Sequence, residues 1–318
     1  MKTRLEELPK SALMPLNIRN RFWDIAFYDV GSLTWDEQKF LFPPNGNIPN
    51  PVFSPYIYQE GEIIVVPPRR AGRKIRYCPS VEQFMDKEGQ DIQAIVLAGV
   101  GSSVFGTAAL ARNVADTYNY DVAGIVTGYG GSDLIEEALG GWFVFGHLDR
   151  LANMIEGSST AWPKKVAKGD VDTRSSGDKR LEDRISKTDD DVAALIDILE
   201  ANPPKLELLL GHSKGSLLID FALGQVIEES QGDEDLFERL KIVTLGAVVS
   251  LPKRFRERRG QSRQIIGALD WFGGMNSRLS LLHRAEIVPL AWHHLNPWFN
   301  FHLGVSKALS GNFAVTRS

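Results

Sequence analysis

The sequence has a single cysteine, Cys78, among its 318 residues. A disulfide within the chain, a Cys-x-x-Cys redox pair and a cysteine-based zinc site each need at least two cysteines, so all three are excluded. Such low cysteine usage is typical of proteins in a reducing compartment, and we expect a cytoplasmic protein. The six histidines form no set with Asp or Glu at metal-ligand spacing, so we expect neither a metal nor a cofactor.

The chain also lacks a long apolar run and an excess of charge of one sign. No stretch approaches the ~20 apolar residues that a membrane-spanning helix needs, so no membrane span is expected. Residues 1–9 include early basic residues but no apolar segment of the signal-peptide type, and we expect no secretory signal. A net charge of −4 does not favour binding to nucleic acid or to an anionic membrane.

Short apolar runs separated by helical patterns indicate the fold class. The runs lie at residues 63–66, 74–77, 94–98, 122–126, 206–210, 242–245, 264–269 and 285–288. The first two flank a Pro- and Gly-containing turn at 67–72, which predicts an antiparallel pair. The others are separated by helical patterns such as 106–117, which predicts a mostly parallel sheet with helices on both faces, an α/β fold.

The pattern suggests two parts of the chain and one insertion. Residues 1–60 are rich in Pro, Asn and aromatics, and we expect an extended N-terminal wrap outside the core. Residues 61–318 then form the α/β domain. Residues 132–200 interrupt the α/β rhythm with an apolar patch at Trp142–Phe145 and a polar stretch at 164–191. This insertion is either a cap over a site or plain core followed by a solvated loop, and both interpretations stay open.

The pentapeptide Gly211-His212-Ser213-Lys214-Gly215 is the most informative motif. An apolar run precedes it and a helical pattern follows it, which is the strand–turn–helix setting of a nucleophile elbow. Glycines two residues before and after the serine leave room for the sharp turn. The turn would raise the Ser213 hydroxyl above the sheet, and we expect the side chain of His212 to point away from it. The alternative is a structural turn in an α/β domain.

A serine hydroxyl needs a base to take its proton, and that base needs an orienting acid. Asp270 follows the run at 264–269 and is the preferred acid, with a loop or helix N-cap aspartate as the alternative reading. The other candidates are weaker because Asp220 lies in the helix after Ser213, and because Asp233 and Asp235 lie in a polar turn.

The base is expected in the loop after the last strand, where the sequence reads Trp292-His293-His294. His293 is preferred, His294 is the alternative, and His283 is a third choice. His302 follows an aromatic run and is expected to be a packing residue.

Two backbone N–H groups are needed to hold an oxyanion. One would come from Lys214, and the second from Val100 or Gly101 in the small-residue loop after the strand at 94–98. This loop also suggests a nucleotide site, but Gly106 comes two positions too late for Gly-x-Gly-x-x-Gly. Thr107 stands where a Walker A motif requires lysine, so both nucleotide readings are weak.

In their order along the chain, these motifs resemble the α/β-hydrolase superfamily, and within it the lipase- and esterase-like members. The resemblance covers residues from about 60 to the end. It implies a Ser–His–Asp hydrolase that cleaves a carboxylic ester through an acyl-enzyme, with Ser213, His293 and Asp270 as the triad. The apolar patch at Trp142–Phe145 suggests an acyl or otherwise hydrophobic substrate. An acyltransferase, a thioesterase or a non-catalytic binding protein on the same fold are the alternatives.

Overall fold

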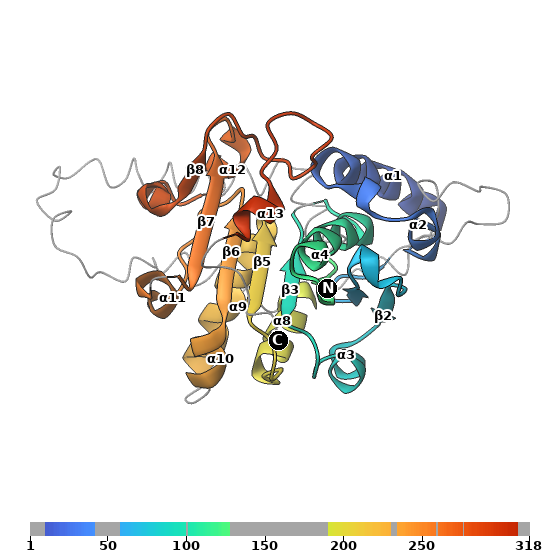
Figure 1. The fold of residues 1–318 in the computed structure, drawn as a ribbon, viewed down its shortest axis with the longest axis horizontal. Helices are drawn as coiled ribbons and strands as arrows, with labels where there is room; N and C mark the ends of the chain where they lie inside the picture. Colours follow the sequence, from blue (N-terminus) through green and yellow to red (C-terminus); the bar gives the residue numbers. More distant parts are fainter. Residues whose placement is uncertain are drawn as a thin grey trace, which may run out of the picture.

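The computed structural model describes residues 10–41, 58–99, 101–127, 190–229, 234–258, 260–275 and 277–310. These residues form an eight-stranded sheet with helices on both faces, which confirms the α/β class (Figure 1). The strands are β1 (Ile63–Val66), β2 (Arg76–Cys78), β3 (Ala94–Leu97), β4 (Val122–Ile125), β5 (Leu208–His212), β6 (Lys241–Leu245), β7 (Ser262–Gly267) and β8 (Glu286–Val288). Each overlaps one of the apolar runs in the sequence.

The strand order places one crossover point near the middle of the sheet. The order is β2-β1-β4-β3-β5-β6-β7-β8, and β1 runs antiparallel to both of its neighbours while all other pairs are parallel. The antiparallel pair predicted for the first two strands is therefore confirmed. Strand β3 pairs with β4 on one side and with β5 on the other. The loops leaving β3 and β5 therefore separate at a topological switch point, where open α/β sheets bind ligands.

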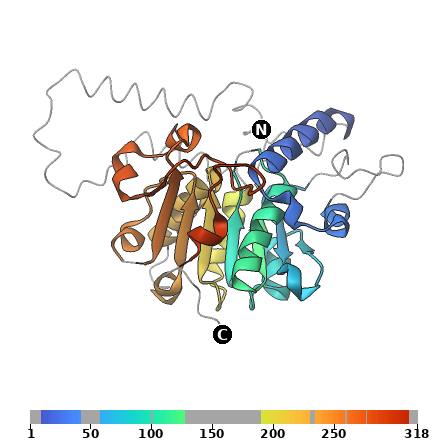
Figure 2. The same cartoon turned by 45° about the horizontal axis from the view of Figure 1, so that its top comes forward.

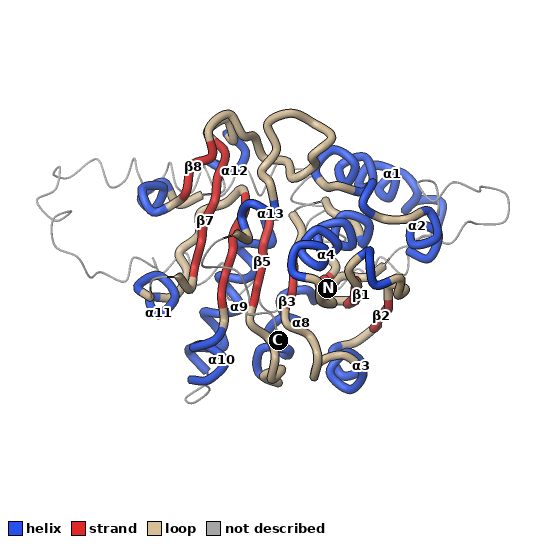
Figure 3. The backbone as a smooth tube through the Cα atoms, in the orientation of Figure 1, coloured by secondary structure: helices blue, strands red, loops and turns tan. Residues whose placement is uncertain are grey.

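The helices around the sheet, blue in Figure 3, differ greatly in length. They are α1 (Lys10–Phe27), α2 (Trp35–Leu41), α3 (Val81–Lys87), α4 (Val104–Tyr118), α8 (Asp190–Glu200), α9 (Lys214–Glu229), α10 (Glu234–Arg239), α11 (Lys253–Glu257), α12 (Trp271–Met275) and α13 (Val305–Ala308), with short 3-10 turns at Val30–Ser32, Arg69–Ala71 and Leu279–Arg284. Within the described ranges, none of these helices combines the length and the apolar character that crossing a membrane requires.

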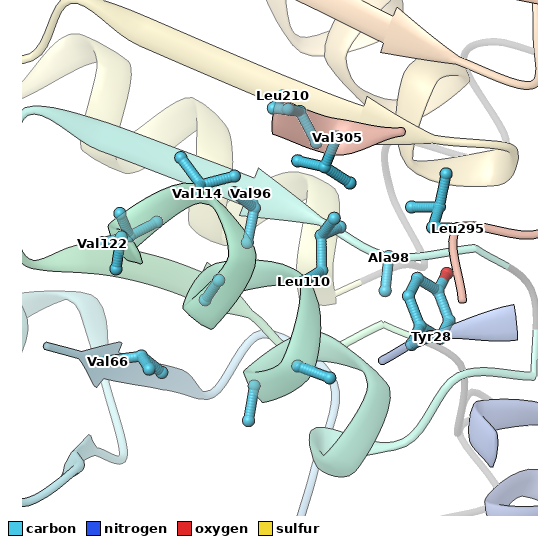
Figure 4. Packing of buried hydrophobic residues seen from close by; sticks show 14 of the residues in the cluster. Tyr28, Val66, Val96, Ala98, Leu110, Val114, Val122, Leu210, Leu295 and Val305 are labelled. Carbon is cyan, nitrogen blue, oxygen red and sulfur yellow. The ribbon is translucent and has the colours of Figure 1, made fainter. Parts of the chain in front are cut away.

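The alternation of side chains along the strands builds a separate apolar core on each face of the sheet. On one face, α4 and α13 pack over a cluster that includes Val96 and Leu210, several members of which Figure 4 shows. On the other face, α3, α8, α9, α10 and α11 cover a cluster that includes Ile95 and Leu209. Burying each such side chain contributes roughly 1.5–3 kcal/mol, so strands buried on both faces are held firmly and form a rigid platform for the loops at their ends.

The N-terminal segment differs from the expected extended wrap. Residues Lys10–Phe27 and Trp35–Leu41 are helical, and Tyr28, Leu33 and Leu41 belong to the core cluster on the α4 face. The expectation followed the Pro and Asn content, but much of that content falls in residues 42–51, which lie outside the described residues. Pro15 within α1 also disfavours a helix locally, whereas Asn20, Arg21 and Asp24 in the second half of the same helix are buried.

The expected insertion at 132–200 is described only in its last part. Residues 132–189 lie outside the described residues, so neither interpretation of that stretch is decided. Residues Asp190–Glu200 form α8, whose buried apolar side chains belong to the second core and lie against the sheet. Residues 190–200 therefore form a helix that packs on one face of the sheet.

Figure 2 shows α1 and the loop that follows β8 at the same end of the sheet. The backbone N–H of Leu295 in that loop donates to the carbonyl of Phe27 at the end of α1, over 2.7 Å. The side chain of Asn296 donates to the carbonyl of Ile25, also over 2.7 Å. Two segments some 270 residues apart in sequence are thereby joined beside the carboxyl ends of the strands.

Candidate active site

Ser213 lies at the sharp turn between β5 and α9. Strand β5 ends at His212 and α9 begins at Lys214, so one residue alone makes the turn. Its φ angle is +52°, in the left-handed region that a residue with a side chain rarely adopts. Strained backbone of this kind persists only where the surroundings enforce it, and it is concentrated at functional sites. The strand–turn–helix context expected for this serine is present.

The glycines on either side of Ser213 are sterically required. A Cβ atom at Gly211 would lie 2.6 Å from the backbone nitrogen of Ser216, and one at Gly215 would lie 2.2 Å from the carbonyl oxygen of Leu97. Both distances are too short for any real carbon contact, so the turn closes only with glycine at these places. The spacing of the motif thus reflects how tightly α9 approaches β3 and β5.

Asp270 and His293 form a buried pair. The Nδ1 atom of His293 lies 2.9 Å from each carboxylate oxygen of Asp270, and both side chains are almost fully buried. Asp270 also accepts a hydrogen bond of 2.6 Å from the backbone N–H of Gly273 in the first turn of α12. The carboxylate of Asp270 therefore contacts both the ring of His293 and the first turn of α12.

The structure separates the two adjacent histidines. His293 faces Asp270 and lines the same cavity as Ser213. The Nε2 atom of His294 instead lies 3.1 Å from the carbonyl of Asn300, and burial lowers the pKa of His294 below its ordinary value. His283, the third choice, is exposed. Of the three, His293 is the histidine that shares a cavity with Ser213.

The cavity that Ser213 and His293 line has a volume of about 100 Å³. Its aromatic wall comes from Trp23 and Phe27 of α1 and from Phe272 of α12. The edge of the Phe27 ring meets the His293 ring at 81°, with the ring centroids 5.7 Å apart. A group entering this cavity would therefore meet the serine, the histidine and an apolar surface together.

The loop after β3 approaches Ser213 closely. A Cβ atom at Gly99 would lie 3.1 Å from the Cβ of Ser213, so a larger residue would crowd the serine. Gly101 is buried with φ +69°, a left-handed conformation suited to glycine. Lys214 begins α9, so its backbone N–H lies at the N-terminus of a 16-residue helix. Val100, the remaining candidate donor, lies outside the described residues.

Helix α1 brings Asp24 to the cavity, a contribution that the sequence did not predict. Asp24 is fully buried and accepts hydrogen bonds from the hydroxyl of Ser102 at 2.9 Å and from the backbone N–H of Ser103 at 3.1 Å. A Cβ atom at Gly106 would lie 2.2 Å from an Asp24 carboxylate oxygen, so glycine there admits the carboxyl to the start of α4. Burial raises the pKa of Asp24 to about 7, although the hydrogen bonds from the two serines oppose that rise.

His212 does not point away from the site, contrary to expectation. Its Nδ1 atom lies 2.8 Å from the hydroxyl of Tyr28, and its Nε2 atom lies 2.8 Å from the backbone carbonyl of His293. Its ring is buried and lines the cavity. The physical reason is Tyr28, which directly follows α1 and offers a buried polar partner that the local sequence around the motif does not reveal.

The i, i+4 spacing in α1 is the signal that would have found these residues. Trp23 and Phe27 fall on one face of a helix, as do Asp24 and Tyr28, because residues four apart are neighbours on a helix surface. The signal has meaning only once the segment is known to be helical, and its composition argued for an extended chain.

The raised pKa of Asp24 predicts that the stability of the folded protein depends on pH. Because its pKa is about 7 in the folded protein and 3.8 as a reference value, the folded state binds a proton that the unfolded state has released between these pH values. The free energy of unfolding should therefore fall as pH rises through this window, by roughly 4 kcal/mol at about 1.4 kcal/mol per pKa unit. Asp24→Asn cannot ionise, so its stability relative to the wild type should rise with pH.

Urea unfolding at pH 4.5, 6 and 7.5 measures this difference. Asp36→Asn, at an exposed carboxylate of α2, controls for the loss of one negative charge. A difference between Asp24→Asn and wild type that stays constant with pH would contradict the prediction.

Comparison of the chain with protein-family models, curated proteins and solved structures gives no match. Within the described part of the chain, no group of three or more His, Cys, Asp or Glu side chains is arranged to hold a metal ion.

Proposed function

We propose that the protein is a serine hydrolase with an α/β-hydrolase fold that cleaves a carboxylic ester through an acyl-enzyme. The observation that carries this proposal is the left-handed Ser213 between two sterically required glycines, in one cavity with the buried Asp270–His293 pair. Parallel strands, a crossover beside the serine and the chain order Ser, Asp, His support the fold assignment.

In the proposed reaction, His293 acts as general base and then as general acid. Asp270 accepts a hydrogen bond from the Nδ1–H of His293, which leaves the lone pair on Nε2 free to act as a base. His293 Nε2 takes the Ser213 hydroxyl proton while Oγ bonds to the ester carbonyl carbon, and the tetrahedral intermediate forms. His293 then gives that proton to the departing alkoxide, so an alcohol leaves and the acyl-enzyme remains. In the second half, His293 takes a proton from a water molecule while the water oxygen bonds to the acyl carbon. His293 then returns that proton to Ser213 Oγ as the bond to the acyl group breaks, which releases the carboxylic acid and restores the enzyme.

The negative charge that develops on the carbonyl oxygen needs hydrogen-bond donors. The backbone N–H of Lys214 at the start of α9 is one candidate, aided by the positive end of the helix. The loop from Gly99 to Ser103 carries the other candidates, Val100 and Gly101. Such donors are commonly worth about 10²–10³ in kcat each.

The wall of Trp23, Phe27 and Phe272 favours an apolar group in the substrate. Aromatic side chains offer a large hydrophobic surface at the place where an acyl or alcohol portion would lie. We therefore propose esters with an apolar portion as the substrate class.

A fluorophosphonate probe tests the proposed nucleophile, because it modifies only a serine activated by a base. The purified protein should be labelled at Ser213, as located by peptide mass mapping, and Ser213→Ala should lose both labelling and ester hydrolysis. Ser216→Ala is the matched control, since it removes a buried hydroxyl three residues further along and should leave labelling intact. Well-folded protein that takes no label, or takes it at another residue, would refute the proposal.

A further inference from the structure

Three hydrogen bonds connect the loops around Ser213 through two side chains outside the proposed triad. The backbone N–H of Gly99 lies 2.7 Å from the hydroxyl of Tyr28. That hydroxyl lies 2.8 Å from Nδ1 of His212, and Nε2 of His212 lies 2.8 Å from the carbonyl oxygen of His293. The side chains of Tyr28 and His212 are both almost fully buried, which shields their hydrogen bonds from bulk water.

The chemistry of the donors fixes the direction of this chain of hydrogen bonds. A backbone N–H only donates, so the Tyr28 oxygen accepts from Gly99. At the other end, the carbonyl oxygen of His293 can only accept, so Nε2 of His212 must donate to it. Nδ1 of a neutral His212 is then unprotonated and accepts from the hydroxyl of Tyr28. The proton of a neutral His212 therefore lies on Nε2, where it donates to the carbonyl of His293. Each polar atom in the chain is satisfied by one neutral tautomer of His212.

The surroundings of His212 keep it neutral. Burial lowers the pKa of His212 well below its ordinary value, and the neighbouring His293 and His294 lower it further. The ring centroids of His212 and His293 lie 4.9 Å apart, and the rings of Tyr28 and His212 meet edge to face at 85°. His212 thus fits the role of a fixed structural link and not that of a proton acceptor.

The three segments that this chain joins are those that the proposed reaction must keep aligned. Gly99 begins the loop that carries the second oxyanion donor, His212 directly precedes Ser213, and the carbonyl belongs to His293 itself. Asp270 holds the ring of His293 through Nδ1, while His212 holds its backbone. Two separate contacts therefore determine where Nε2 of His293 lies relative to Ser213.

We propose that Tyr28 and His212 are positioning residues. They hold the loop from Gly99 to Ser103 and the general base His293 in fixed positions relative to Ser213. This inference rests on the proposed function. It gives α1 a role in the reaction, because Tyr28 directly follows the last residue of that helix. A displacement of about 1 Å in such a site can cost about 100-fold in rate, so loss of the link should appear in kcat.

Tyr28→Phe removes both hydrogen bonds of the hydroxyl and keeps the ring. We expect kcat for ester hydrolysis to fall about 10- to 100-fold, with KM changed by less than about 3-fold, because the loss acts on the aligned transition state. Tyr118→Phe is the matched control, since the Tyr118 hydroxyl donates to the carbonyl of Leu309 away from the site. It should leave kcat and KM within about 2-fold of wild type. A Tyr28→Phe variant with wild-type kcat would overturn the inference.

Variants of His212 test the same link from its other end. His212→Asn keeps an oxygen that can accept near the Nδ1 position, and His212→Gln keeps a donor that can reach the carbonyl of His293. Both should retain more kcat than His212→Ala, at similar KM. Equal kcat in all three variants would contradict a role that depends on these hydrogen bonds.

Nitrogen NMR of wild-type protein labelled at histidine tests the link without any activity. His212 should show the tautomer protonated at Nε2, unchanged between pH 5.5 and 8.5, and its Nδ1 resonance should shift in Tyr28→Phe. A titrating His212, or one protonated at Nδ1, would overturn the inference even if the protein hydrolyses esters. Absence of fluorophosphonate labelling together with the expected tautomer would instead count against the proposed function alone, and would remove the catalytic purpose from the link.

Discussion

His293→Gln is expected to lower the rates of fluorophosphonate labelling and ester hydrolysis by about 10⁴-fold or more, while His294→Gln should leave both within about 3-fold of wild type. The reason is the different surroundings of the two neighbours. His293 faces Asp270 and lines the cavity with Ser213, whereas Nε2 of His294 is occupied by the carbonyl of Asn300. Glutamine is close in size to histidine and retains hydrogen-bonding capacity, but it cannot act as a base.

Second-order labelling rates at pH 7.5 measure this difference, and urea unfolding shows whether each variant folds. The His294→Gln control carries the same substitution one residue along and should cost only about 1 kcal/mol of stability through its hydrogen bond. If His294→Gln were the inactive variant and His293→Gln the active one, the proposed base would be wrong. If neither lost labelling, Ser213 would be activated by some other group.

The parts of the molecule that were predicted from the sequence are those encoded by local signals. The run before Ser213, the flanking glycines and the apolar spacing after it lie within some twenty residues, and together they specify β5, the turn and α9. Asp270 was also found locally, because an acidic residue after an apolar run is placed at the carboxyl edge of a parallel sheet. His293 and His294 were both placed in the correct loop, but sequence alone did not separate them, since their orientation depends on what each ring meets in space.

The contributions of α1 were missed because they depend on contacts between distant residues. Asp24 meets Ser103 across 79 positions of sequence, and Tyr28 meets His212 across 184. The i, i+4 spacing in α1 shows which of its residues share a face, but it does not encode which distant residue each of them contacts. The polar partner of His212 decides that its ring lies in the site. The Pro- and Asn-rich composition of the first 60 residues further concealed a helix that ends at the cavity.

Gly246→Ala is expected to lower kcat by about 100-fold or more while the protein remains folded. Gly246 follows β6 with φ +68°, and a Cβ atom there would lie 2.9 Å from both Cε1 and Nδ1 of the His293 ring. Such a contact is shorter than real carbon atoms tolerate, so the ring must move. The movement would break the paired contact of Nδ1 with Asp270 and displace Nε2 from Ser213.

Gly72→Ala separates this effect from backbone strain. Gly72 has φ +63°, nearly the same conformation, but an added Cβ atom there meets nothing within 4 Å. Both variants should lose about 1–2 kcal/mol of stability from the left-handed conformation of alanine, whereas only Gly246→Ala should lose labelling and turnover. Equal activity in the two variants would mean that the His293 ring is free to shift without consequence, which is incompatible with a base held in a fixed place. Loss of activity in Gly246→Ala alone would show that the absence of a side chain at residue 246 is what admits the imidazole to its position beside Asp270.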